Sequence, residues 1–119
     1  MEFNWSAFVE VPGFLARWQA VGCTDADLRR LQLDLLNDPT AWPVVPTAGG
    51  WRKARFAPPS WGRGKSGAVR VYYADLTAFG RIYLATAFTK AEMADIPAKD
   101  KRRMAQLLAA IRRRLEEQH

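Results

Sequence analysis

The chain of 119 residues predicts an α+β domain built from two N-terminal helices, an antiparallel β-sheet meander and a C-terminal helix. Three observations support this fold class. Apolar residues recur at helical spacing near both ends, apolar and polar residues alternate in the middle, and prolines and glycines separate these segments. A hydrophobic share of 49% is enough to bury a core without disulfides or metal ions. We therefore expect residues 1–119 to form a single domain.

Two helices are expected before the sheet, after a short apolar run at 5–11 that fits an opening strand. From Gly13 onward apolar residues fall at helical spacing, and Gly22 is a suitable stop for this first helix. The run 24–27 nearly matches a capping box, which favours the start of a second helix. That helix is expected to end at 37–39, and its leucines form one apolar stripe: Leu28, Leu31, Leu35 and Leu36.

Three strands of an antiparallel meander are expected in the middle of the chain, at 51–57, 69–74 and 81–87. The preceding segment, 39–50, contains three prolines and ends in two glycines, so we expect an ordered connector there. The loop at 58–67 is rich in glycine and proline, and we expect it to be basic and mobile.

The C-terminal helix is expected from Lys99, and Pro97 suits its first turn. A single apolar stripe on this charged helix is expected to pack on the domain or on a partner. The run 112–114 consists of three arginines, which predict a solvated helix face, with contact to ribosomal RNA as the alternative. The stripe consists of Met104, Leu107, Leu108, Ile111 and Leu115.

Several classes of protein are excluded by what the sequence lacks. Cys23 is the one cysteine, so no internal disulfide can form, and no Cys/His cluster has zinc-ligand spacing. The N-terminus lacks a basic and then apolar leader, and no apolar run approaches the roughly 20 residues that a membrane span needs. We therefore expect a cytoplasmic protein without a membrane segment, a metal ion or another cofactor.

The positive charge is concentrated in the middle third of the chain. Residues 51–90 hold eight bases and one acid, a net charge of +7, whereas residues 1–50 carry a net charge of −3. Cations neutralise phosphates and aromatic rings stack on unpaired bases, so this pattern is typical of RNA binding, with a solvated basic surface as the equal alternative. The interleaved aromatic residues are Trp51, Trp61, Tyr72, Tyr73 and Tyr83. The candidate RNA contacts are Arg52, Arg63, Lys65 and Tyr72.

Alternation of side chains along the strands predicts one cationic face. Lys53 and Arg55 share a face of the first meander strand, whereas Arg52 projects from its other face. In the next strand, Arg70 and Tyr72 are expected to point outward beside them, with Tyr72 as a stacking ring. The opposite side of that strand is expected to face the core: Val69, Val71 and Tyr73.

Cleavage of RNA without a metal ion requires a base, an acid and charge stabilisation, because the 2′-OH attacks its own phosphate. The one histidine, His119, is the last residue, so lysine, arginine and tyrosine must supply these roles. Lys53 is the candidate for proton transfer, because the flanking Arg52, Arg55 and Arg70 favour its neutral form. Arg55 and Arg70 suit the phosphorane charge. Which group is base and which is acid stays open.

Five short segments occur in order along the chain and carry a resemblance. Their order and spacing resemble the RelE/HigB-like toxins of bacterial type II toxin-antitoxin modules, and the HigB-like variants in particular. The resemblance covers nearly the whole chain. The segments are 46–57, which includes Gly-Gly-Trp-Arg-Lys, then 64–67, 69–73, 82–84 and 88–90.

This resemblance implies a RelE-like microbial RNase fold and a ribosome-dependent mRNA endonuclease, or mRNA interferase. It implies a catalytic set of Lys53, Arg55, Arg70 and Lys90. It also implies a HigA-like antitoxin with a helix-turn-helix, which either covers the cationic face or docks elsewhere and blocks access to the ribosomal A site. Some relatives use a tyrosine after the last strand, but 91–96 has no aromatic residue, so that role is not carried over.

Two other classes of protein remain open at this stage. A noncatalytic RNA-binding module would use the same cationic surface, and a structural partner protein would use only the helices. Substitution of Lys53 or Arg70 separates the enzyme from the noncatalytic RNA-binding module. An enzyme loses turnover while it keeps most of its RNA affinity, whereas a binding module loses affinity alone.

Overall fold

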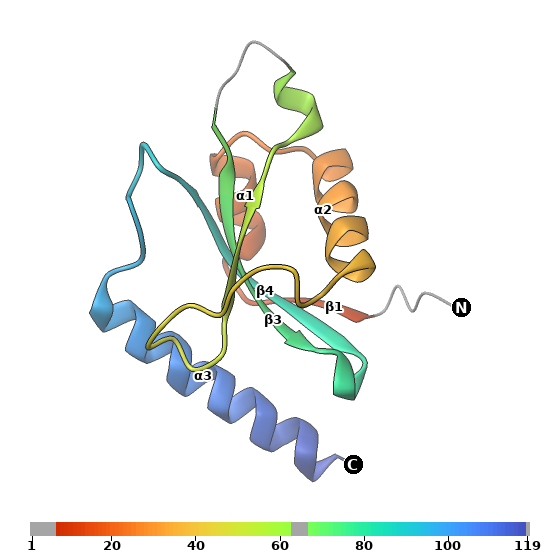
Figure 1. Ribbon diagram of the computed structural model, residues 1–119, viewed down its shortest axis with the longest axis vertical. Coiled ribbons are helices and arrows are strands. Elements are labelled where there is room, and N and C mark those ends of the chain that lie inside the picture. The colour runs from red at the N-terminus through yellow and green to blue at the C-terminus, as the bar shows by residue number, and fades with distance from the viewer. Residues whose placement is uncertain (1–6, 63–66, 119) are drawn as a thin grey trace.

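The computed structural model describes residues 7–62 and 67–118, and it confirms the α+β fold class (Figure 1). Two N-terminal helices precede the main strands, and a long helix ends the chain. Short 3-10 turns lie at Pro59–Trp61 and Thr77–Phe79. The helices and strands are β1 (Phe8–Glu10), α1 (Phe14–Ala20), α2 (Asp25–Asn37), β2 (Arg52–Phe56), β3 (Val69–Leu76), β4 (Arg81–Thr89) and α3 (Ala98–Glu117).

The four strands form one mixed sheet in the order β1-β4-β3-β2. β2, β3 and β4 make the predicted antiparallel meander. The opening strand expected at 5–11 is present as β1, but it adds a parallel edge, with Phe8 opposite Ile82 of β4. Alternation along a sequence predicts that a strand exists, whereas its partner and direction depend on where the intervening helices return the chain.

The boundaries of the N-terminal helices agree with their predicted signals. Gly22 has a φ of 90°, in the left-handed region that suits the residue after a helix. The capping box of α2 is complete, because the Thr24 hydroxyl accepts from the Asp27 N–H and the Asp27 carboxylate accepts from the Thr24 N–H. α2 ends at Asn37, as expected.

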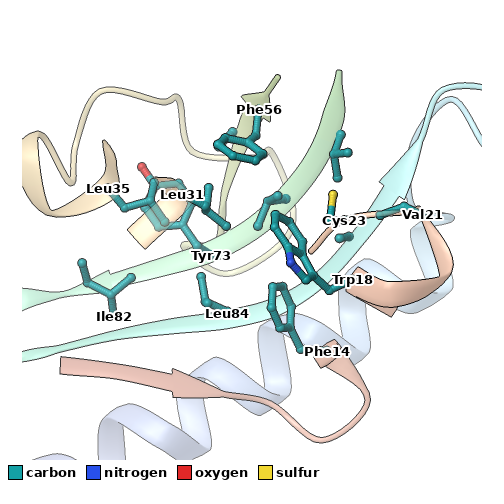
Figure 2. Packing of buried hydrophobic residues seen from close by; sticks show 14 residues of the cluster. Phe14, Trp18, Val21, Cys23, Leu31, Leu35, Phe56, Tyr73, Ile82 and Leu84 are labelled. Carbon is teal, nitrogen blue, oxygen red and sulfur yellow. The ribbon is translucent and has the colours of Figure 1, made fainter. Parts of the chain in front are cut away.

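The sheet carries large side chains on both faces, and helices cover both faces. α1 and α2 cover one face, where Phe14 stacks on Trp18 and Trp18 contacts Phe56 (Figure 2). α3 and its preceding connector cover the other face, where Trp51 and Tyr72 are fully buried. Burial of a phenylalanine-sized side chain contributes roughly 1.5–3 kcal/mol. The prediction that Tyr72 lies on a solvent-exposed face is therefore wrong.

The C-terminal helix packs on the domain, and the glycines of 39–50 make this possible. A Cβ atom on Gly49 would lie 2.7 Å from the Ala105 Cα atom of α3, far inside contact distance. Close to this contact between Gly49 and α3, the Trp51 indole N–H donates to the Met104 carbonyl of α3 at 2.8 Å. The two glycines that resemble a toxin motif thus have a structural role, because they let the connector lie directly against α3.

We predict that Gly49→Ala destabilises the protein more than Gly80→Ala. Both glycines have a positive φ, +77° and +70°, and a left-handed conformation costs an alanine about 1–2 kcal/mol. Only the Gly49 position adds a backbone clash, because a Cβ on Gly80 meets nothing within 4 Å. Urea unfolding of both variants measures the difference in the free energy of unfolding, and equal losses would contradict the proposed contact with α3.

Candidate nucleic-acid interface

Both predicted catalytic arginines occupy opposed positions on adjacent strands of the sheet. Arg55 of β2 is directly opposite Arg70 of β3, so their side chains share a face. Arg55 is exposed and Arg70 is half-buried. Like charges at opposed positions destabilise a sheet, and the ion pairs within the described residues include neither arginine. An anion bound between the two guanidinium groups would relieve this repulsion.

A third predicted residue, Lys90, comes close to Arg70 around a pocket of about 300 Å³. The pocket lies at the loop end of the sheet, where β2 ends, β3 begins and β4 ends. The Arg70 guanidinium is held at its edge, because Nη1 donates to the Ala68 carbonyl at 3.2 Å. The residues that line the pocket are Val21, Trp61, Gly67, Ala68, Arg70, Thr89, Lys90 and Ala91. The structure thus brings two of the four predicted catalytic cations, Arg70 and Lys90, to one pocket. Arg55 is opposite Arg70 in the strand register and lines a second pocket, against α2.

The fourth predicted catalytic residue, Lys53, is engaged by a carboxylate that the sequence analysis missed. Its Nζ atom lies 3.4 Å from Oδ1 of Asp95, in the connector between β4 and α3. Lys101 of α3 lies 2.9 Å from the other Asp95 oxygen. The expectation that only cations flank Lys53 is therefore wrong. No local sequence pattern predicts the contact between Asp95 and Lys53, because the connector reaches Lys53 only in the folded chain.

Asp95 is the centre of a polar cluster. The Tyr72 hydroxyl donates to its Oδ1 atom at 2.5 Å, and the Ile96 N–H donates to the same atom at 2.8 Å. Burial by itself raises the pKa of Asp95, but the hydrogen bonds from Tyr72, Lys101 and Ile96 and the charge of Lys53 bring the pKa well below its usual range. The cluster ties the connector to β2, β3 and α3.

Tyr72 is not available as a stacking ring. Its exposed fraction is 0%, and the ring contacts Phe88 at a centroid distance of 6.0 Å. Burial, followed by the hydrogen bond to Asp95 and the charge of that carboxylate, raises the pKa of Tyr72. Tyr72 is buried because the connector and α3 cover this part of the sheet. Tyr73 faces the α1/α2 core as predicted, and burial raises its pKa to about 12.

Arg52, another predicted RNA contact, is not part of this cationic group. Arg52 projects from the other face of β2, where Nη1 donates to the carbonyls of Trp42 at 2.6 Å and Thr40 at 3.4 Å. It therefore holds the connector at 39–50 in place. Arg63 and Lys65 lie outside the described residues.

No family model matches the chain. The likeness to the RelE/HigB-like toxins therefore rests on the order of the sequence motifs and stays a prediction. Within 7–62 and 67–118, no group of three or more His, Cys, Asp or Glu side chains is placed to hold a metal ion. No helix in this part of the chain is both long and apolar enough to cross a membrane.

We predict that Asp95→Asn lowers the free energy of unfolding at pH 7 by about 1 kcal/mol, after allowing for the partial exposure of this carboxylate. A carboxylate with a lowered folded-state pKa contributes stability above its unfolded pKa of about 3.9, and the contribution is lost as pH falls toward the folded-state pKa. The difference between wild type and variant should therefore narrow between pH 4 and pH 2.

Urea unfolding across this pH range measures the effect. Asp34→Asn is the matched control, because it removes the same charge from an exposed pair with Arg30 on α2. A loss that is equally large at pH 2 and pH 7 would show that the negative charge of Asp95 is not what stabilises the cluster.

Proposed function

We propose that this protein is a metal-independent endoribonuclease that cleaves mRNA on the ribosome, as the cytoplasmic toxin of a type II toxin-antitoxin module. The observation that carries the proposal is the cross-strand pair of Arg55 and Arg70, which lacks a carboxylate partner among the described ion pairs. Lys90 adds a third cation at the same end of the sheet. The order of the sequence motifs gives the family to which such a site would belong.

In this proposal the two arginines bind the scissile phosphate. A guanidinium presents paired donors that match two phosphate oxygens, and a neighbouring pair suits the extra negative charge of the phosphorane. The 2′-OH then attacks the phosphorus atom, which leaves a 2′,3′-cyclic phosphate and a 5′-OH end. We propose Lys53, which lies beside Asp95, as the candidate proton donor to the leaving oxygen, and Lys90 as the candidate acceptor of the 2′-OH proton.

A noncatalytic RNA-binding module is the second candidate, and one observation favours it. Asp95 engages Lys53, so the residue predicted to transfer a proton is already in an ionic contact. The arginine pair would still bind the phosphates of a single strand. Measurement of affinity and turnover on the same variants decides between the two candidates.

We predict that induced expression of the wild type arrests growth and that Arg70→Ala abolishes the arrest. In a translation extract, loss of one charge-stabilising donor should lower the cleavage rate about 100- to 1,000-fold, with a smaller loss of RNA affinity. Products should carry 5′-OH ends and should form unchanged when a chelator removes free zinc or manganese at constant magnesium.

Arg29→Ala is the matched control, because it removes one exposed arginine from α2, which covers the other face of the sheet. This variant should stay fully toxic. Circular dichroism checks that Arg70→Ala is folded. Full toxicity of folded Arg70→Ala would refute the proposed site, whereas RNA binding without any cleavage by the wild type would favour the binding module.

The proposal includes a cognate antitoxin with a helix-turn-helix. We predict that it protects the cationic face, because an acidic or aromatic segment complements the charges of Arg55 and Arg70. Hydrogen exchange of the complex should then show slower exchange across β2 and the start of β3. Slower exchange confined to α1 and α2 would indicate remote docking instead. If no product of an adjacent gene binds tightly, the toxin-antitoxin part of the proposal fails and the nuclease part stands.

A further inference from the structure

Of the five aromatic residues that the sequence analysis singled out in the basic middle third, Trp61 lines a pocket together with Arg70 and Lys90. Trp51, Tyr72 and Tyr73 are each 0% exposed, so no base can reach their rings. Tyr83 contributes to a different pocket, against α3. Trp61 is half-buried and lines the 300 Å³ pocket together with Arg70 and Lys90.

Hydrogen bonds to the end of α1 and the start of α2 hold the 3-10 turn that carries Trp61. The Trp61 Nε1–H donates to the Gly22 carbonyl at 3.3 Å. The preceding residue, Ser60, is tied to the buried Asp27 by a backbone N–H bond of 3.0 Å and a hydroxyl bond of 2.5 Å. Burial alone raises the pKa of Asp27, but the hydrogen bonds from Ser60 and Thr24 lower it below its usual value. The ring is therefore pre-positioned, which reduces the entropy lost when a ligand stacks on it.

The pocket combines an aromatic wall, small apolar side chains and two cations. Val21, Ala68 and Ala91 supply apolar surface that has no hydrogen-bonding groups on its side chains. A volume of about 300 Å³ lies at the lower end of the range for small-ligand sites. Such a pocket suits one flat, apolar-faced group that carries a negative charge at its edge. A nucleotide unit of a single strand has this chemistry, since its base has two π faces and its phosphate is an anion.

We infer that this pocket is a subsite for one unpaired nucleobase of single-stranded RNA, which stacks on Trp61 while its phosphate contacts Arg70 and Lys90. The inference rests on the proposed function and names where a nucleotide beside the scissile phosphate is held. Stacking requires an unpaired base, because both faces of a base in a duplex are covered by its neighbours. Val21, Ala68 and Ala91 offer no base-edge readout, and the Thr89 hydroxyl already bonds to Glu92, so the subsite should accept all four bases with similar affinity.

The test uses a short, fluorescein-labelled single-stranded RNA with 2′-O-methyl groups, which cannot be cleaved, in an intact form and with one abasic position. Trp61→Leu keeps an apolar side chain against the core but removes the π face, and it should weaken binding of the intact RNA about tenfold or more. Trp61→Phe keeps a π face and should retain most of the affinity. Thermal unfolding confirms that both variants are folded.

The base contact itself is tested by combining the variants with the abasic probe. For wild type, removal of the base at the subsite should cost about as much affinity as Trp61→Leu does. For Trp61→Leu, the same removal should cost little further affinity, because the stacking contact is already lost. The abasic position is moved along the probe in turn, so that the stacked nucleotide is found by its effect.

Three outcomes would overturn the inference. Wild-type affinity in Trp61→Leu would show that the ring contacts no base, and cleavage by this variant at the normal rate would leave the proposed function intact. Equal weakening of the intact and every abasic probe by Trp61→Leu would show that Trp61 acts on the fold of the site alone. Failure of the wild type to bind or cleave any single-stranded or ribosome-bound RNA would overturn the proposed function and this subsite with it.

Discussion

The burial of β3 on both faces is the constraint on which the rest of the structure depends. Val71 and Tyr73 pack toward α1 and α2, whereas Tyr72 and Ala74 pack toward α3. A strand that is apolar on both sides must be covered on both sides, so neither the N-terminal helices nor α3 can leave the sheet without exposing large side chains to water. The close approach of Gly49 to α3 is one consequence of this requirement.

This two-sided coverage also decides where a polyanion can approach. α3 crosses the sheet away from the turn Pro59–Trp61, as Figure 1 shows. The loop end of the sheet therefore keeps its cations accessible, and Arg55 and Arg70 remain opposite each other there. Nearer to α3, the same face carries Tyr72, whose hydroxyl donates a hydrogen bond to Asp95. The boundary between the buried core and the proposed interface thus falls within one face of the sheet.

The polar clusters at this boundary place the segments around the proposed site. Asp95 connects β2, β3 and α3 through Lys53, Tyr72 and Lys101. On the face covered by α1 and α2, Asp27 accepts hydrogen bonds from Ser60 and so holds the turn that carries Trp61. Both carboxylates are stabilised in their charged form by several donors, which makes each cluster more dependent on pH than an exposed ion pair would be.

The sequence by itself determined the elements and their order. Helical spacing, the capping box at Thr24 and the glycine stop at Gly22 are local signals, and the structure confirms each of them. Alternation likewise located the meander strands and placed Arg55 beside Arg70, because cross-strand neighbours follow from the pairing of adjacent strands. These features depend on residues that are close together along the chain or on adjacent strands.

Only the tertiary structure decided which face of the meander is covered. Alternation assigns side chains to two faces but does not say what packs on them. Tyr72 was therefore expected at the surface, but it is buried, together with Trp51, beneath α3 and its connector. Asp95 was not predicted for the same reason, because it contacts Lys53 from a position far along the chain, after β3 and β4. The pocket at Trp61 joins the end of α1, a 3-10 turn and the ends of two strands. Contacts of this kind depend on long-range packing, which no local pattern encodes.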